Sequence, residues 1–502
     1  MKKSRFLAAV LALLMLLSTA GTMTACSGAE TSDPGGEPAA VDSTADDAEE
    51  AAGAEDVPET EAELTDNVPD TVKLGGDTVT ILYREAMANE FIASDEYAGE
   101  IVNDAILEKN HRVEERLEVT LEHIPNPSTD WNGGYQSVIS QSIIAGDESY
   151  DIISGPSYHI PTLIVEGYLY NLNEVPYLEF EQPWWTQSLM ETTAFGNKLY
   201  LVSGDISLGM IKYLHCTFFN KDLAADYHIE DLYQTVLNDQ WTLDKMRSLT
   251  DGMYVDVNNN GTADLDVDKF GYVITDSNLW RAFIDSLGVN YFYINNEGNP
   301  EFNFSDPRAV DVGDAFTQLV GPGSDNDIVM GSGNDMSYNI FTNNRSLFVL
   351  GRFIDSELAY RDMEADFGFL PMPKWDETQE GYHTTICGSE STFGIPVNSS
   401  RTDVLGAVME VMAYESYTSV TPAYYESALK VKYTRDDITS QMIDLIRTGA
   451  RFNPTVQLSK LLGGTDYHII NCAIAGTSVA TTFAGMSKSM EKKLEKLMET
   501  LG

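Results

Sequence analysis

The chain has 502 residues, which allows about three domains of common size and at least two sizeable hydrophobic cores. Hydrophobic residues make up 43% of it and aromatic residues 10%, which is typical of a globular α/β protein and excludes collagen, coiled coil and wholesale disorder. Its 31 Lys and Arg against 78 Asp and Glu give a net charge of −47. Such a charge repels phosphate groups, so nucleic acids and anionic membrane surfaces are excluded as primary partners.

The N-terminus has the features of a secretory signal. Three basic residues within positions 2–5 precede an apolar run over residues 6–17, which is too short to span a bilayer. The sequence Met23-Thr24-Ala25-Cys26 then resembles the lipobox of bacterial lipoproteins. The resemblance implies cleavage before Cys26 and attachment of acyl chains such as palmitate, which would anchor the exported protein at the outer face of the bacterial cell membrane. Plain secretion is the alternative.

Residues 27–72 contain 15 acidic residues, no basic ones, and many Ala, Thr, Gly and Pro. Such a segment cannot bury a core, and the repulsion between its charges extends it. We therefore expect 1–26 to be a signal peptide and 27–76 to be a disordered acidic tether. Residues 73–502 have 28 basic and 63 acidic residues, so the folded body is acidic as well.

Strand and helix patterns alternate at the start of the folded body. Such alternation predicts a mainly parallel sheet covered by helices, in which ligands bind beyond the carboxyl ends of the strands. One wall of a binding site is thus expected at Arg84 and Glu85 and at residues 154–158, which include Ser154 and Tyr158. The predicted strands are 78–83, 119–124 and 149–154, and the predicted helices are 101–117 and 135–145.

A second unit follows, with predicted strands at 214–220 and 270–275 and a helix over 221–226. Another helix begins near Thr242, a suitable N-cap residue. Cys216, Cys387 and Cys472 show neither a CxxC pair nor zinc-ligand spacing. One disulfide could form among them, but we expect buried free thiols.

Five sequence motifs resemble those of the family 1 extracellular solute-binding proteins of ABC importers. Residues 218–223 and 241–246 are similar to the family's "YNKDLF … TWDEL" signature. Residues 150–153 with 167–172, then 341–353 and 367–373, resemble further family motifs in the same order. Asn344 stands where the family usually has Gly, and Phe353 where it has Trp. The pair Trp184-Trp185 resembles a motif of larger, oligosaccharide-type members, or else packs in the core.

The resemblance implies a type II periplasmic-binding-protein-like fold, with two α/β lobes joined by a hinge. It places residues 77–208 and 345–389 in the first lobe, and 209–344 and 390–502 in the second. It also implies a monomeric, non-enzymatic lipoprotein that captures a sugar or oligosaccharide between its lobes and delivers it to ABC transporter permease subunits. The acidity of the body favours a neutral carbohydrate.

Residue by residue, the resemblance adds ligand-binding positions to the wall already named. Asp205 would be a carboxylate at the first crossover between lobes, and Glu390 lies at the second. The full expected set is Arg84, Glu85, Ser154, Tyr158, Asp205, Asp276, Asn278, Trp280, Arg352, Phe353 and Glu390. For each, a solvated loop position or a packing aromatic is the alternative.

Residues 256–268 contain a calcium-like loop. Asp256, Asn258, Asn260 and Gly261 match positions 1, 3, 5 and 6 of an EF-hand, but Val267 stands at position 12. Asp268 would therefore have to reach the ion through a one-residue bulge. The predicted ligands of a structural Ca²⁺ are Asp256, Asn258, Asn260, Thr262, Asp264 and Asp268. An Asn- and Asp-rich turn is the alternative.

The sequence contains no H-E-x-x-H, no G-x-S-x-G and no P-loop motif. A glycosidase needs only two suitably spaced carboxylates, so a secreted carbohydrate-active enzyme stays open. A lipoprotein that binds peptides or cationic solutes and a surface adhesin are further alternatives.

Overall fold

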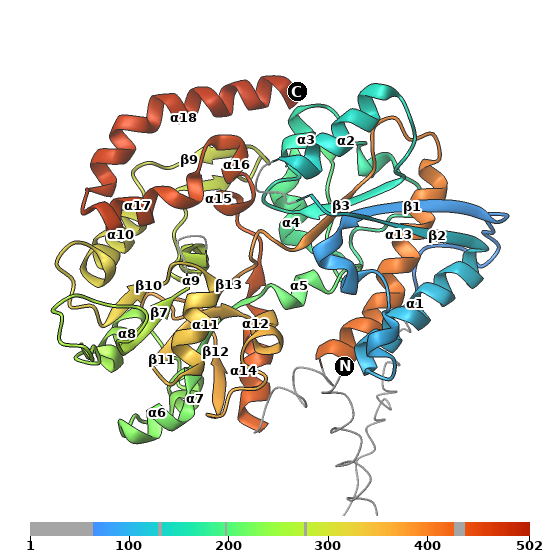
Figure 1. The fold of residues 1–502 in the computed structure, drawn as a ribbon. Coiled ribbons are helices and arrows are strands. Elements are labelled where there is room, and N and C mark those ends of the chain that lie inside the picture. The colour runs from blue at the N-terminus through green and yellow to red at the C-terminus, as the bar shows by residue number, and fades with distance from the viewer. Residues whose placement is uncertain (1–63, 129–132, 196–197, 276–278, 426–436, 502) are drawn as a thin grey trace, which may run out of the picture. The chain divides into compact units, whose positions relative to one another are not determined.

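The computed structural model describes residues 64–128, 133–195, 198–275, 279–425 and 437–501, and residues 64–502 form one compact unit. Two main β-sheets organise this unit, and each is flanked by helices (Figure 1). We call the elements around the first sheet lobe 1 and those around the second sheet lobe 2. Both lobes are of the mixed α/β type that the sequence predicts.

The sheet of lobe 1 has the strand order β14-β3-β1-β2. β1 runs parallel to β2 from Asp77↔Val119 onward and parallel to β3 at Ile81↔Ile152, whereas β14 joins β3 antiparallel. In Figure 1 the helices α2 and α3 cover one face of this sheet, and α1 and α13 cover the other. The strands are β1 (Asp77–Arg84), β2 (Val119–Asn126), β3 (Ile152–Pro156) and β14 (Ser391–Gly394).

The longer helices of lobe 1 are α1 (Ile101–Leu117), α2 (Gly134–Ala145) and α13 (Thr402–Glu415). The α2 helix ends at Gly146, whose φ of 70° is a left-handed conformation that glycine adopts without a steric penalty. Shorter elements complete the lobe: η1 (Glu85–Glu90), η2 (Asp95–Tyr97), α3 (Thr162–Val165), η4 (Leu172–Glu174), α4 (Gln187–Thr193), β4 (Ala194–Phe195), β5 (Lys198–Leu199) and the π-helical η6 (Ser416–Val420).

The sheet of lobe 2 has the order β10-β7-β11-β6-β12. β11 is central, since it pairs antiparallel with β6 and parallel with β7. The turn before it contains Asn344 at a φ of 56°, so asparagine takes the left-handed conformation expected where the family has glycine. The strands are β6 (His215–Asn220), β7 (Phe270–Ile274), β10 (Ile328–Met330), β11 (Ser346–Arg352) and β12 (Phe367–Leu370).

Many short helices surround the sheet of lobe 2. Thr242 caps α8 as predicted, since its hydroxyl accepts a hydrogen bond from the Lys245 amide at 3.1 Å. The helices are α5 (Gly209–Lys212), α6 (Lys221–Asp226), α7 (Leu232–Leu237), α8 (Leu243–Thr250), η5 (Leu279–Arg281), α9 (Ala282–Ser286), α10 (Pro307–Val320), α11 (Asn334–Thr342), α12 (Phe353–Leu358) and α14 (Asp437–Thr448).

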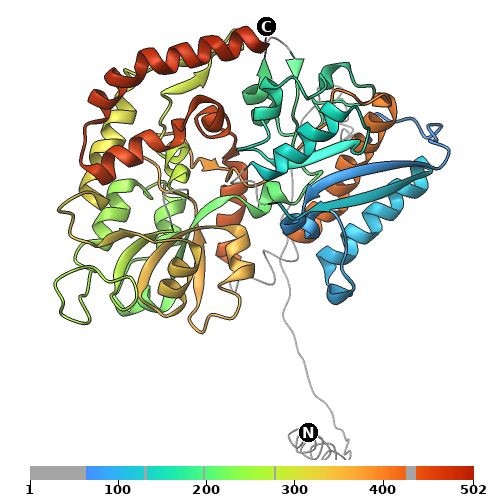
Figure 2. The ribbon, with the colours of Figure 1, turned by 45° about the horizontal axis from the view of Figure 1, so that its top comes forward.

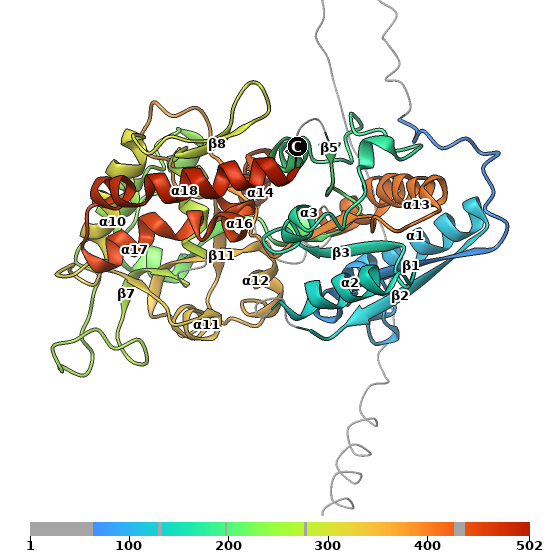
Figure 3. The ribbon, with the colours of Figure 1, turned by 90° about the horizontal axis from the view of Figure 1, so that it is seen from above.

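The C-terminal part of lobe 2 is helical. Figures 2 and 3 show the red helices α17 (His468–Ala475) and α18 (Val479–Leu501) side by side, and α10 packs against both. The elements are α15 (Pro454–Gln457), α16 (Ser459–Leu462), η8 (Thr465–Tyr467), α17 (His468–Ala475) and α18 (Val479–Leu501), and small strand pairs are formed by β8 (Phe292–Ile294) with β9 (Pro300–Phe302) and β13 (Thr384–Thr385) with β15 (Ala450–Arg451).

The predicted lobe boundaries are wrong after residue 344. Residues 345–389 contain β11 and β12, which pair with β6 in lobe 2, and β14 returns the chain to β3 of lobe 1. The family motifs predict the order of the elements along the chain, but they do not predict which sheet each strand joins. The α13 helix packs on α1 in lobe 1, and α14 then packs on β12 in lobe 2, so the chain crosses between the lobes three times.

The folded body also begins earlier than predicted. Val68 is only 3% exposed, and Arg116 forms an ion pair with Asp66 that includes a 2.9 Å hydrogen bond. Residues 64–76 are therefore packed against lobe 1 and are not part of a tether. Cys26 and the predicted signal lie outside the described residues. No helix in the part of the chain that the structure describes is long and apolar enough to cross a membrane.

Trp184 and Trp185 belong to the core of lobe 1. Both indole N–H groups donate hydrogen bonds to the buried carboxylate of Glu410 on α13, at 3.2 and 3.0 Å. Burial raises the pKa of Glu410 to about 7, although the hydrogen bonds from the indoles and the Glu179 amide oppose this rise. The alternative of packing aromatics is thus confirmed. The prediction of free buried thiols is confirmed as well for Cys216, Cys387 and Cys472.

Candidate functional site

Polar side chains of both lobes meet beyond the ends of the central strands. In lobe 1, β1 ends at Arg84 and β3 is followed by Ser157 and Tyr158. In lobe 2, β11 ends at Arg352, and Arg281 lies in the η5 turn that comes after β7. The segment that precedes β14 connects the two lobes and contacts lobe 1 here. The Tyr158 amide donates a hydrogen bond to the Gly388 carbonyl of this segment at 3.1 Å.

Arg281 is the centre of the contact between the lobes. Its side chain is 2% exposed, and its guanidinium carbon lies 4.6 Å from the ring centroid of Tyr158 in lobe 1. A second ring, that of Tyr467, lies 5.6 Å away, and Asp466 forms an ion pair with Arg281 at 2.9 Å. These contacts keep the buried guanidinium charged, because Asp466 offsets the desolvation that would lower its pKa.

Glu390 is a buried carboxyl group on the lobe-connecting segment, where the sequence predicts it. It is 0% exposed, and neither of its oxygens has a hydrogen bond of normal geometry among the described residues. Burial raises its pKa to about 8, and Ser157 and Arg84 only partly oppose this effect. The group is therefore mainly protonated at neutral pH. Arg84 itself donates to the backbone carbonyl of Ser389.

The site continues toward Glu90 and Tyr213. Glu90 is 3% exposed and accepts hydrogen bonds from Ser207 and, at 2.8 Å, from Ser391. The Arg352 guanidinium lies 5.5 Å from the Tyr213 ring centroid. Arg352 is also ion-paired with Asp355 at 2.8 Å, so its charge is balanced within lobe 2.

The remaining predicted residues are placed differently. Trp280 is 1% exposed, donates its indole N–H to the Asp466 carbonyl at 2.8 Å and packs edge-on against Phe316. Phe353 is fully buried against Phe369. Both rings therefore fill the core of lobe 2 and present no face to a ligand in this arrangement, which favours the alternative of packing aromatics over the predicted ligand contacts. Trp280 comes after β7 and Phe353 comes directly after β11, but both side chains point into the apolar interior of lobe 2.

Of the other five predicted residues, the structure describes three, and these contribute little to the site or lie apart from it. Glu85 is exposed, and the buried Ser154 hydroxyl has no hydrogen-bond partner among the described residues. Asp205 lies on the first crossover, where burial raises its pKa to about 6 although Thr421 and Arg447 oppose the rise. Asp276 and Asn278 lie outside the described residues.

Sequence reasoning missed several residues of the site. Arg281 directly follows Trp280, which the sequence does place among the ligand-binding positions, so the same strand-end argument extends to it. Asp466 and Tyr467 belong to a C-terminal turn with no family motif, so only the fold brings them to Arg281. Glu90 was missed because it lies in the 3₁₀ turn after the strand-end pair.

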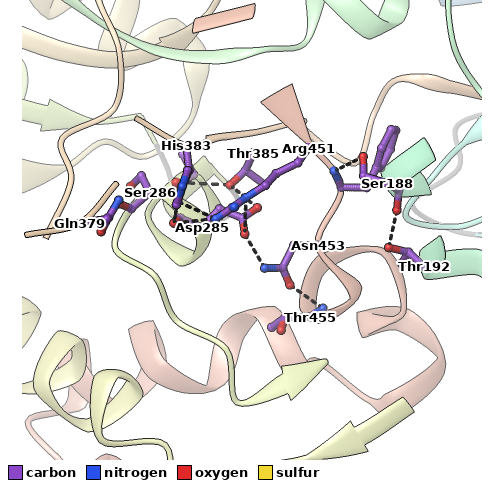
Figure 4. A network of polar contacts seen from close by, with 12 residues as sticks. Ser188, Thr192, Asp285, Ser286, Gln379, His383, Thr385, Arg451, Asn453 and Thr455 are labelled. Carbon is purple, nitrogen blue, oxygen red and sulfur yellow. Dashed lines mark hydrogen bonds and ion pairs between the residues drawn. The ribbon is translucent and has the colours of Figure 1, made fainter. Parts of the chain in front are cut away.

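A second polar network ties the lobes together beside this site (Figure 4). The Asp285 carboxylate is buried and accepts hydrogen bonds from Asn453 at 2.6 Å and Thr385 at 3.1 Å. One residue before Asn453, the Phe452 amide donates to the Ser188 hydroxyl of α4 in lobe 1 at 3.1 Å. The network fixes the β15 turn at the border of lobe 1.

The loop over residues 256–268 uses its acidic groups to organise itself. The Asp268 side chain is 0% exposed, and its carboxylate accepts hydrogen bonds from the amides of Val257 and Asp264 at 2.9 and 2.8 Å. Asp256 likewise accepts from the amides of Asn260 and Gly261. No group of three or more His, Cys, Asp and Glu side chains in the described residues is arranged to hold a metal ion. Calcium binding here stays a prediction.

Three solved structures share the fold. The maltose/maltodextrin-binding domain MalE of Bdellovibrio bacteriovorus, bound to maltotriose, is 13% identical with a TM-score of 0.52, covering 83% of this chain and 100% of that one. The GacH receptor of Streptomyces glaucescens, solved unliganded and with acarbose, is 12% identical with a TM-score of 0.52, covering 83% and 99%. The ABC substrate-binding protein Lmo0181 of Listeria monocytogenes, in complex with cycloalternan, is 13% identical with a TM-score of 0.51, covering 85% and 99%.

The chain has the two-lobe periplasmic-binding-protein fold. At these identities the comparison establishes the architecture alone. No family model and no curated protein sequence matches the chain.

The calcium prediction is tested by chelation. A site that binds only the native state stabilises it by mass action, by about 2.7 kcal/mol at a hundredfold excess over the dissociation constant. We expect EDTA to lower the melting temperature of the full chain relative to calcium-saturated buffer, and Asp256→Ala to remove the difference. Asp311→Ala, on the exposed face of α10, is the matched control and should retain it. A melting temperature that does not change with EDTA would show that the loop is a turn that binds no calcium.

The buried Glu390 carboxyl makes stability depend on pH. Its folded pKa of about 8 exceeds the unfolded value, so the native state binds the extra proton and stability falls as pH rises from about 5 to 8. Glu390→Gln removes this proton, and its stability relative to the parent should grow over this range by up to about 1.4 kcal/mol per pH unit. Urea unfolding at each pH measures the difference.

The exposed Glu495→Gln serves as the control for that experiment. It removes one carboxylate from α18 and should leave the slope unchanged. A stability difference between Glu390→Gln and the parent that is constant from pH 5 to 8 would contradict a buried, protonated Glu390.

Proposed function

We propose that this chain is the substrate-binding subunit of an ABC importer that captures a neutral sugar or oligosaccharide between its two lobes and delivers it to the permease. The observation that carries the proposal is the buried polar site around Arg281, Glu390 and Tyr158, which both lobes build at their strand ends. The fold supports it, because the structural neighbours are sugar-binding proteins by their titles.

The chemistry of the site suits a sugar. In this arrangement the Tyr158 ring of lobe 1 packs on the Arg281 guanidinium of lobe 2, and opening of the lobes would free its face for the apolar CH groups of a pyranose. A protonated Glu390 both donates and accepts hydrogen bonds, as sugar hydroxyl groups require. Arg281 adds a planar fork of donors. Ligand entry needs the lobes to open, and the two crossovers that the structure describes, near Asp205 and Glu390, provide a hinge for such a motion.

Binding without turnover is the test of this proposal. The purified full chain is screened for thermal shift against maltose, cellobiose, xylobiose and their longer oligomers, and the sugar is recovered and chromatographed. We expect at least one series to raise the melting temperature and to be recovered unchanged. Hydrolysed sugar would show an enzyme, and a shift with cationic peptides only would show a different solute class.

A variant pair locates the binding in the interlobe site. Arg281→Lys keeps the charge that pairs with Asp466 but loses the planar fork, so affinity should fall about tenfold. Arg247→Lys, on the exposed side of α8, is the control and should bind normally. Equal affinities in calorimetry would remove Arg281 from the ligand site.

The lipid anchor at Cys26 is part of the same proposal. It is supported by the signal features and by the small residue before Cys26. When the chain is expressed in a bacterium fed with labelled palmitate, we expect the label in the protein and the protein in the membrane fraction. Cys26→Ala should lose both, and Cys472→Ala should lose neither. Label that persists in Cys26→Ala would refute the anchor.

A further inference from the structure

A cavity of about 630 Å³ lies beside the interlobe site. It is bounded by α2 and α3 of lobe 1, with Lys460 of α16 contributed by lobe 2. Its volume falls within the range of small-molecule sites, about 300–1,000 Å³. The cavity therefore has room for a ligand that would touch both lobes at once.

The lining of this cavity is polar and nearly neutral. Gln136, Ser140, Glu166 and Lys460 supply an amide, a hydroxyl, a carboxylate and an ammonium group, and Tyr168 and His159 each supply an aromatic ring. Glu166 accepts a hydrogen bond from Ser140 at 3.2 Å, whereas the Gln136 amide oxygen has no hydrogen-bond partner among the described residues. Many hydrogen-bonding groups, two rings and balanced charges match a neutral polyhydroxyl compound better than an apolar or ionic one.

The cavity adjoins the interlobe site through consecutive residues. His159 lines the cavity, and its neighbour Tyr158 packs on Arg281 in the interlobe site. The two rings have centroids 5.0 Å apart. Burial and the nearby cations, chief among them Lys460, lower the pKa of His159 to about 4, so the wall that the two sites share is uncharged at neutral pH.

We propose that this cavity is an additional sugar subsite, and that the ligand is an oligosaccharide of at least two units that extends from the interlobe site into it. The inference rests on the proposed function and deepens it by naming the size class of the ligand. An oligosaccharide that contacts Gln136 in lobe 1 and Lys460 in lobe 2 binds the closed arrangement of the lobes better than an open one. It therefore shifts the population toward closure.

Affinity as a function of chain length tests the subsite. Calorimetry is done with the sugar series that gives the thermal shift, from the monosaccharide to the hexamer, on the full chain. Affinity should rise between one unit and the length that reaches the cavity. Gln136→Ala and Lys460→Ala should each weaken the longer oligomers about fivefold, as expected for one lost hydrogen bond, and leave the shortest bound form unchanged.

Lys488→Ala is the matched control, since it removes an exposed lysine of α18. It should bind every oligomer as the parent does. If Gln136→Ala and Lys460→Ala bind all lengths like the parent, or lose affinity equally at every length, the cavity is no subsite, although sugar binding stands. If no sugar of any length binds the parent, both the subsite and the proposed function fall.

Discussion

A guanidinium group as deeply buried as that of Arg281 needs a carboxylate to balance its charge and rings to pack against, and the geometry between the lobes follows from that need. Asp466 neutralises it and the Tyr158 and Tyr467 rings flank it. Tyr158 belongs to lobe 1, while the other partners belong to lobe 2. The same interaction that balances the charge therefore also sets where the two sets of strand ends meet.

Glu390 has the opposite environment, because its burial is not matched by partners. Its two oxygens lack hydrogen bonds of normal geometry among the described residues, and it responds by retaining its proton. An unsatisfied buried group of this kind costs stability. It is typical of a functional site, where a ligand supplies the missing hydrogen bonds. The two groups thus differ in their surroundings: Arg281 has protein partners that also join the lobes, whereas Glu390 lacks the hydrogen bonds that the proposed ligand would supply.

Local periodicity was enough to predict the elements of lobe 1. The strand 78–83, the helix 101–117 and the strand 119–124 all lie within one or two residues of β1, α1 and β2. Residues 345–389 were assigned to the wrong lobe, because strand pairing depends on contacts between distant segments that no local pattern contains.

The candidate site was predictable only in part, for a related reason. Arg84, Tyr158 and Glu390 lie at strand ends or crossovers and do come together, because parallel strands end at one edge. A position near a strand end does not determine which way the rings of Trp280 and Phe353 point. Burial of an apolar ring is more favourable in free energy than its exposure, and both rings are buried. Asp466 needed the C-terminal helices to bring it to Arg281 from far along the chain.

Charge on two length scales bears on which solute the site accepts. The whole chain carries −47, so anionic solutes are repelled at long range. At the site, a carboxylated sugar would need a cation without a partner, but Arg352 is paired with Asp355 and Arg281 with Asp466. Binding an acid through Arg352 or Arg281 would require breaking a buried ion pair, which costs about 3–5 kcal/mol. A neutral sugar avoids both costs, so the long-range field and the local pairing favour the same class of ligand.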